Sequence, residues 1–165
     1  TALETRLTRA LRRADKPQER RPWPIMFQAP MVRAILAGAK TVTRRTNVER
    51  WGTRRPGDLL WVREAWRGGK DLLVPSPVIY RAVAPYHPGP WRSAMMMPRW
   101  ASRITLSVVG VRAECLHDIT EEEEAMEGVV VGTYRTIWDV INGGKPGLAW
   151  ADNPLVARVE FRRAA

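Results

Sequence analysis

The chain of 165 residues is poor in the side chains that metal and disulfide sites need. It has one cysteine, Cys115, and two histidines, His87 and His117. A lone cysteine excludes an intramolecular disulfide framework, and zinc clusters need several thiolates or imidazoles at fixed spacing. We therefore expect a site that works without a metal and without a cofactor.

Long apolar runs are also missing. The longest ones fall far short of the ~20 residues that a membrane-spanning helix requires, and no segment resembles the apolar core of a signal peptide. The sequence thus predicts no membrane contact and a cytoplasmic location.

Negative charge is scarce. The sequence has 27 Lys and Arg residues against 17 Asp and Glu residues, a formal net charge of +10 and a pI near 10.9. Such a field attracts polyanions, of which the phosphate backbone is the commonest. An Arg-rich composition also arises from genome bias and a solvated surface, so charge alone is suggestive. RNA, another nucleic acid or a modified nucleoside is the expected partner, and the oligomeric state is left open.

The length and the 45% apolar content suit one domain with a core. Residues 1–22 differ in character, because three leucines at a four-residue spacing alternate with arginines before a polar stretch. We expect a basic N-terminal arm with a short helix over 1–22, and the folded domain over 23–165.

Periodicity and turn signals predict the order of elements. Strands are expected at 24–28, 40–45, 58–66, 78–82, 103–116 and 155–163, and helices at 30–38, after Thr120, and at 134–141. Residues 46–58 are expected to form a basic loop, the proline-rich stretch 68–98 a loop region, and Gly110 a bulge. The pattern predicts an α+β fold, a small β-barrel with short helices packed at its ends.

The stretch ILAGAKTVTRRT, residues 35–46, gathers polar groups at the start of a predicted strand. Lys40 is one of four lysines in the chain. Burial or neighbouring cations would lower its pKa and release a free amine, although a phosphate clamp or a surface charge is an equally ordinary role. The guanidinium groups of Arg44 and Arg45 suit phosphate and base edges. Arg54 and Arg55 could extend that basic patch.

Three other residues are candidates for ligand binding. Glu64 lies on a strand between two tryptophans, where a buried carboxylate would need a partner. Arg99 and Trp100 could stack on a base of single-stranded nucleic acid. Packing of Trp100 under the long loop is the alternative.

Several segments in order resemble the ASCH domain, a member of the PUA-like superfamily. They are APMVRAILAG, KTVTRR, PGDLLWVRE, MPRWASRITL, DITEEEEAMEG and the final VEF strand, and together they extend over about residues 23–163. The details are similar to ASCH proteins of phages and prophages. The resemblance implies a β-barrel with a cleft for RNA or a nucleotide-like ligand.

The resemblance also implies a chemistry. Some ASCH enzymes deacetylate N4-acetylcytidine with a lysine, a threonine and a glutamate, which fall here on Lys40, Thr43 and Glu127. Others are described as ribonucleases. Three functions therefore remain open: a metal-free amidohydrolase, a ribonuclease, and a non-catalytic RNA-binding or phage accessory protein.

Overall fold

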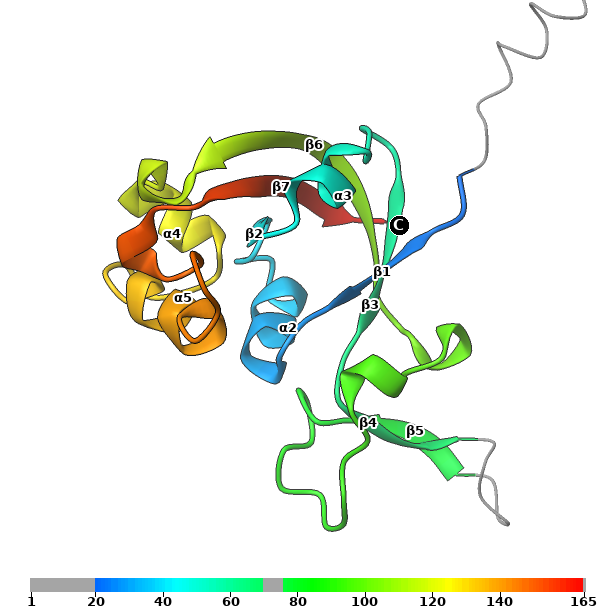
Figure 1. The fold of residues 1–165 in the computed structure, drawn as a ribbon. Coiled ribbons are helices and arrows are strands. Elements are labelled where there is room, and N and C mark those ends of the chain that lie inside the picture. The colour runs from blue at the N-terminus through cyan, green and yellow to red at the C-terminus, as the bar shows by residue number, and fades with distance from the viewer. Residues whose placement is uncertain (1–19, 70–75, 165) are drawn as a thin grey trace, which may run out of the picture.

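A curved five-stranded sheet carries the fold (Figure 1). The computed structural model describes residues 20–69 and 76–164, so the expected arm over 1–22 lies almost wholly outside the described residues. Across the sheet the strands run β1 (Trp23–Met26), β3 (Leu59–Arg63), β6 (Thr105–Cys115), β7 (Leu155–Arg163) and β2 (Val42–Arg45). Strands β1 and β3 are parallel, and the other neighbours are antiparallel.

Short helices lie around this sheet. They are α2 (Ala29–Leu36), α3 (Val48–Gly52), α4 (Glu121–Met126) and α5 (Tyr134–Asn142), with 3₁₀ turns at Ala94–Met96, Arg99–Ala101, Leu116–Asp118 and Trp150–Asp152. Strands β4 (Trp66–Gly69) and β5 (Ser76–Tyr80) form a separate two-stranded sheet. Helices α4 and α5 lie at one end of the molecule and the small sheet at the other (Figure 1). The expected α+β class is confirmed.

The core follows the two-residue period of β7. Ala157, Val159 and Phe161 are buried in the main apolar cluster. The intervening Val156 points to the other face and packs with Trp138 in a second cluster. The strand therefore joins the main core to the end of the molecule that holds α4 and α5.

The edge strands β1 and β2 approach each other through a side chain. Arg45 in β2 donates a hydrogen bond of 2.7 Å to the carbonyl of Met26 in β1. Within 20–69 and 76–164, backbone pairing does not join these two strands. The sheet is thus curved like a barrel wall, with a side-chain bridge between its edges.

Helix α2 ends as its sequence predicts, but strand β2 begins later. Gly38 has a φ of 77°, the left-handed conformation that favours glycine. The amides of Ala39 and Lys40 then both donate to the carbonyl of Ala34. Because these hydrogen bonds hold Lys40 in the turn after the helix, β2 starts at Val42 and not at Lys40 as expected.

Two further elements differ from expectation. The predicted loop 46–58 contains α3, because the side chain of Asn47 caps the amide of Arg50 and Trp51 buries its ring. The predicted strand 58–66 is divided at Glu64, where the chain leaves the large sheet and enters the small one. The expected bulge is present, since the pairing register shifts between Val108 and Gly110.

Candidate functional site

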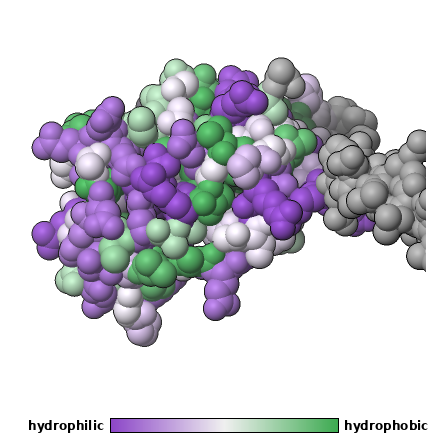
Figure 2. All heavy atoms as spheres, turned by 90° about the horizontal axis from the view of Figure 1, so that it is seen from above, coloured by the Kyte–Doolittle hydropathy of each residue, from purple (hydrophilic) through white to green (hydrophobic). Residues whose placement is uncertain are grey.

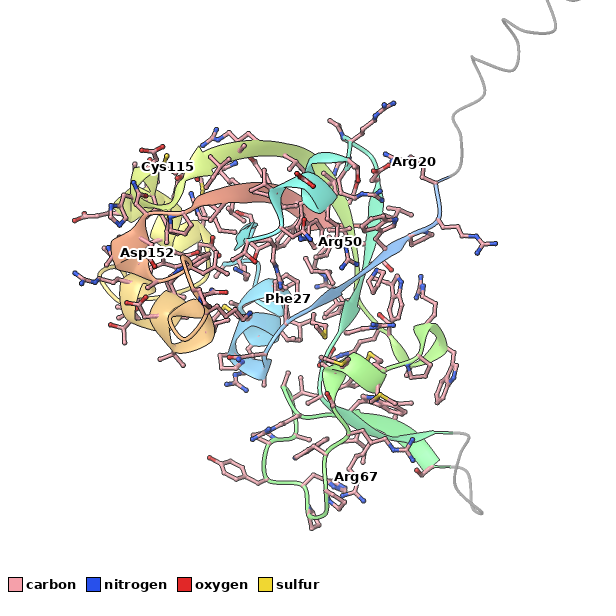
Figure 3. The ribbon with its side chains drawn as sticks, in the orientation of Figure 1. Arg20, Phe27, Arg50, Arg67, Cys115 and Asp152 are labelled. Atoms are coloured by element: carbon pink, nitrogen blue, oxygen red, sulfur yellow. The ribbon has the colours of Figure 1, made fainter. Side chains whose placement is uncertain are left out.

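A pocket of about 920 Å³ opens between the β1–α2 junction, strand β2 and helix α5. Its volume lies within the range of small-ligand sites. Figure 3 shows Phe27 near the middle of the molecule, where β1 leads into α2. The walls of the pocket include Phe27, Lys40, Thr43, Arg45, Glu127 and Tyr134.

Lys40 lines this pocket and is only 3% exposed. Its Nζ donates three hydrogen bonds, to the Val42 carbonyl at 2.8 Å, the Glu127 carbonyl at 2.9 Å and Glu127 Oε2 at 2.7 Å. Burial lowers the pKa of Lys40 below its ordinary value, although the charge of Glu127 opposes this shift. The ammonium group is held in place by acceptors on three sides.

Glu127 stands at the end of α4 and is also 3% exposed. Its carboxylate lies between two cations, with Oε2 accepting from Lys40 and Oε1 accepting from Arg44 Nη1 at 2.9 Å. A buried carboxylate requires such partners. The pair of Lys40 and Glu127 therefore places an acid and a base in direct contact beside the pocket.

Gly128 explains how α4 comes so close to the α2–β2 turn. It has a φ of 80°, and a Cβ added there would lie 2.6 Å from the Ala34 Cβ and 2.9 Å from the Lys40 Cβ. The amide of Thr41 also donates to the carbonyl of Met126 at 2.8 Å. Close backbone packing thus positions Glu127 against Lys40.

Arg44 is the second cation that binds Glu127 and fixes its carboxylate beside Lys40. Its side chain has no exposed surface and donates to Glu114 at 2.9 Å, Glu127 at 2.9 Å and Glu123 at 2.6 Å. Neighbouring Arg112 and Arg158 also bind Glu123. These residues lie at the α4–α5 end of the molecule, whose surface is mostly hydrophilic on the left of Figure 2. The guanidinium of Arg44 thus donates hydrogen bonds to three carboxylates. These bonds link β2 to β6 and to α4.

Thr43 lies in the same pocket, 5% exposed, opposite Val159 of β7. Among the described residues no hydrogen bond involves its hydroxyl. Because Lys40 lies in a turn, the strand alternation that would separate it from Thr43 does not apply. Lys40, Thr43 and Glu127 all line the same pocket.

Arg45 lines the pocket above Phe27, with its guanidinium carbon 5.0 Å from the ring centroid. Burial lowers the pKa of Arg45, yet an arginine stays charged because its ordinary pKa is so high. Its Nε is buried and has no hydrogen-bond partner within the described part of the chain. It is a cation with an unused donor beside the pocket.

Helix α5 contributes residues that sequence reasoning missed. Tyr134, Trp138 and Asn142 are buried and line the pocket. Burial, and then the neighbouring charge of Glu127, raise the pKa of Tyr134 above its ordinary value. Their four-residue spacing puts all three on one helix face, and that spacing was the signal available in the sequence.

The other predicted site residues lie away from this pocket. Arg54 stacks 3.4 Å above the Trp23 ring, and Arg55 is exposed beside it. Glu64 is 1% exposed and accepts two hydrogen bonds from Arg103, at 3.1 and 3.0 Å. Glu64 thus has the partner that a buried carboxylate needs, in an ion pair outside the pocket.

Arg99 and Trp100 form part of a separate surface. Trp100 is 45% exposed and meets Trp66 edge to face at 5.8 Å between ring centroids. Arg99 lies over the Trp61 ring at 5.7 Å. Trp100 is the most exposed tryptophan of the described residues, and the other tryptophans are buried or half-buried.

The described residues contain neither a metal-binding cluster nor a membrane-spanning helix. No group of three or more His, Cys, Asp or Glu side chains there is arranged to hold a metal ion. None of the described helices has the length and apolar character needed to cross a bilayer.

No protein-family model and no curated protein matches the chain. Solved structures do resemble it. Protein EF3133 from Enterococcus faecalis V583, of family DUF984, is 10% identical, covers 98% of this chain and 91% of its own, and gives a TM-score of 0.52. At that identity the similarity shows a shared fold and nothing more.

Two other solved structures are more distant in shape. The hypothetical protein PH0355 is 17% identical over 87% of this chain and 100% of its own, with a TM-score of 0.48. An ASCH domain from Lactobacillus crispatus JV V101 is 12% identical over 81% of this chain and 69% of its own, with a TM-score of 0.45. Structural similarities with TM-scores this low say nothing about the function of this chain.

Proposed function

We propose that the chain is an ASCH-type, PUA-like domain whose pocket binds the base of a nucleoside or of an RNA nucleotide and hydrolyses an amide on that base. The order of ASCH-like segments in the sequence supports the family, and the α+β fold agrees with it. One observation carries the chemistry: Lys40, Thr43 and Glu127 all line the same pocket, with Lys40 Nζ 2.7 Å from Glu127 Oε2.

The proposed reaction uses the short contact between amine and carboxylate. Burial lowers the pKa of Lys40, so its ammonium can pass a proton to Glu127 when a bound ligand displaces bulk water and leaves one water molecule beside the amide. The free amine then takes a proton from the water that attacks the amide carbonyl. Glu127 returns its proton to the leaving nitrogen. One water is consumed, and the products are a carboxylic acid and the free exocyclic amine.

Thr43 and the aromatic residues position the ligand in this scheme. The Thr43 hydroxyl can donate to the amide carbonyl while charge develops on its oxygen. Phe27, Tyr134 and Trp138 offer ring surfaces for a base. Arg45, which lies over Phe27, adds a cation beside the bound ring.

The test is hydrolysis of N4-acetylcytidine by the purified protein, followed as cytidine formed. We expect turnover by the wild type and a loss of at least about a hundredfold for Lys40→Met and Thr43→Val. The exposed Arg55→Ala serves as the matched control and keeps wild-type activity. Thr43→Val is nearly isosteric, so it reports on chemistry even where Lys40→Met disturbs folding. Full activity of both folded variants contradicts the proposal.

A second function, non-catalytic RNA binding, is favoured by the hydrogen bonds of the Lys40 ammonium group. All three donors of its Nζ are occupied by oxygen acceptors, which is the pattern of a structural ion pair. Under this alternative RNA binds, but neither N4-acetylcytidine nor the RNA chain is cleaved. Cleavage of unstructured RNA that depends on Lys40 would instead favour the ribonuclease function.

A further inference from the structure

The pocket holds more positive charge than the proposed hydrolysis needs. One carboxylate, Glu127, lines it together with six cations: Arg33, Lys40, Arg44, Arg45, Arg81 and Lys145. The whole chain has 27 basic residues against 17 acidic ones. The pocket is therefore far more basic than the composition of the chain accounts for.

These cations differ in their surroundings. Lys40 and Arg44 are buried and paired with Glu127. Arg33, Arg81 and Lys145 are exposed, and within 20–69 and 76–164 no ion pair joins any of them to a carboxylate. The charges of Lys40 and Arg44 are thus balanced, while those of three cations at the exposed part of the pocket are not.

The three exposed cations come from segments far apart in the chain. Arg33 lies on α2, Arg81 directly follows β5, and Lys145 lies shortly after α5. The fold brings all three to one pocket. Arg33 also donates to the carbonyl of Ala82 at 3.3 Å, which links α2 to the segment of Arg81. We call Arg33, Arg81 and Lys145 the cationic rim.

We propose that this pocket takes a phosphorylated nucleotide, either a free 5′-monophosphate or a residue of an RNA chain, with its phosphate on the cationic rim. The inference rests on the proposed function, because the base occupies the interior beside Phe27 and Lys40. A phosphate monoester carries about −1.5 to −2 charges at neutral pH, and guanidinium groups bind its oxygens in a bidentate manner. A neutral nucleoside leaves the rim unused.

The volume agrees with a ligand of this size. About 920 Å³ lies near the upper limit of the ~300–1,000 Å³ typical of small-molecule sites. The pocket therefore has room for a base together with its sugar and phosphate.

The experiment compares equilibrium binding of cytidine, cytidine 5′-monophosphate and a cytidine trinucleotide to the full chain by calorimetry. We expect the monophosphate to bind at least about tenfold more tightly than cytidine at low salt. The triple variant Arg33→Gln, Arg81→Gln and Lys145→Gln loses that preference and binds cytidine as the wild type does. A trinucleotide that binds more tightly than the monophosphate identifies an RNA residue as the ligand, and equal affinities identify the free nucleotide.

The control variant removes the same charge elsewhere. Arg21, Arg162 and Arg163 are exposed and lie outside the pocket, so changing all three to Gln must keep the preference for the monophosphate. Equal binding of cytidine and the monophosphate by the wild type overturns this inference but leaves the proposed function intact. Equal loss of preference in both triple variants also overturns it, because net charge would then be the cause. Failure of all three ligands to bind overturns the inference and the proposed function together.

Discussion

Each partner of the Lys40–Glu127 ion pair depends on the other. Lys40 and Glu127 are each 3% exposed, so their charged groups lose most of their hydration. That loss is offset only when every donor and acceptor of the pair forms a hydrogen bond of good geometry. Nζ has three acceptors, and the carboxylate has a cation at each oxygen. Removing one partner leaves a buried charge without its counter-ion.

Glu127→Gln tests this dependence. The amide keeps the shape of the carboxylate but removes its charge, so Lys40 and Arg44 face each other without the anion between them. We expect the free energy of unfolding to fall by about 3 kcal/mol, measured by urea denaturation at neutral pH. Glu160→Gln is the control, because Glu160 is 43% exposed in its ion pair with Arg158, and it should change stability by less than about 1 kcal/mol. Equal effects of the two changes contradict the account of the buried pair.

At the scale of elements, helix α4 is the part that completes the pocket wall. It has six residues, too few to be stable alone, so its place depends on contacts at both ends. Thr120 caps its first turn by accepting from the Glu123 amide at 3.2 Å, and Gly128 lets its last turn approach the α2–β2 turn.

Gly128→Ala should displace the end of α4. The added methyl group would overlap the Ala34 and Lys40 side chains and would also occupy a positive φ. Gly132→Ala is a matched control, because Gly132 has a φ of 88° and an added Cβ there meets nothing within 4 Å. We expect Gly128→Ala to lower the free energy of unfolding by about 1–3 kcal/mol more than Gly132→Ala does. A difference near zero would show that the close approach is unimportant.

Helix α4 should also make stability depend on pH. Burial alone raises the pKa of Glu123, but Arg44, Arg158 and Arg112 outweigh it and hold that pKa below the ordinary 4.5. A carboxyl group whose folded pKa is depressed stabilises the fold above its unfolded pKa and loses that effect as pH falls through its folded pKa. The stability gap between wild type and Glu123→Gln, followed by urea denaturation, should therefore close as the pH falls below about 4.5. A gap that stays constant from pH 7 to pH 3 contradicts this assignment.

Some of these elements could be predicted from the sequence, and others could not. Helix α2, strand β7 and the Thr120 cap have strong periodic or capping signals, and their prediction succeeded. Helix α3 was missed because five residues give no measurable period. The division of the strand at Glu64 was also missed, and the partner that Glu64 has there, Arg103, lies 39 positions away.

The candidate site was only partly accessible from the sequence for the same reason. The segment 40–45 concentrates polar residues locally, and the family resemblance added Glu127. The role of Arg44 was not visible, because its three carboxylate partners lie 70 or more positions along the chain. The contribution of Tyr134 and Asn142 was missed although their four-residue spacing is visible, because an ordinary amphipathic helix has the same spacing.

At the scale of the whole molecule, the net charge of +10 should favour the proposed association with nucleic acid. Each phosphate contact releases counter-ions, so the logarithm of affinity falls linearly with the logarithm of salt concentration, with a slope near ~0.7 per contact for single strands. We expect a slope of about −2 for a short RNA on the three-residue cationic rim. A salt-independent affinity, measured by fluorescence titration, would contradict nucleic-acid binding by this surface.

The central claim is that the pocket bounded by Lys40, Thr43 and Glu127 is where the ligand binds. The most direct measurement is a titration of ¹⁵N-labelled protein with cytidine, the product of the proposed hydrolysis, followed by amide chemical shifts. The account predicts concentrated shifts at Phe27, Thr43, Gly128 and Asn142, around the pocket. Shifts centred on Trp100 and Arg54, with the pocket amides unchanged at saturating ligand, would contradict it.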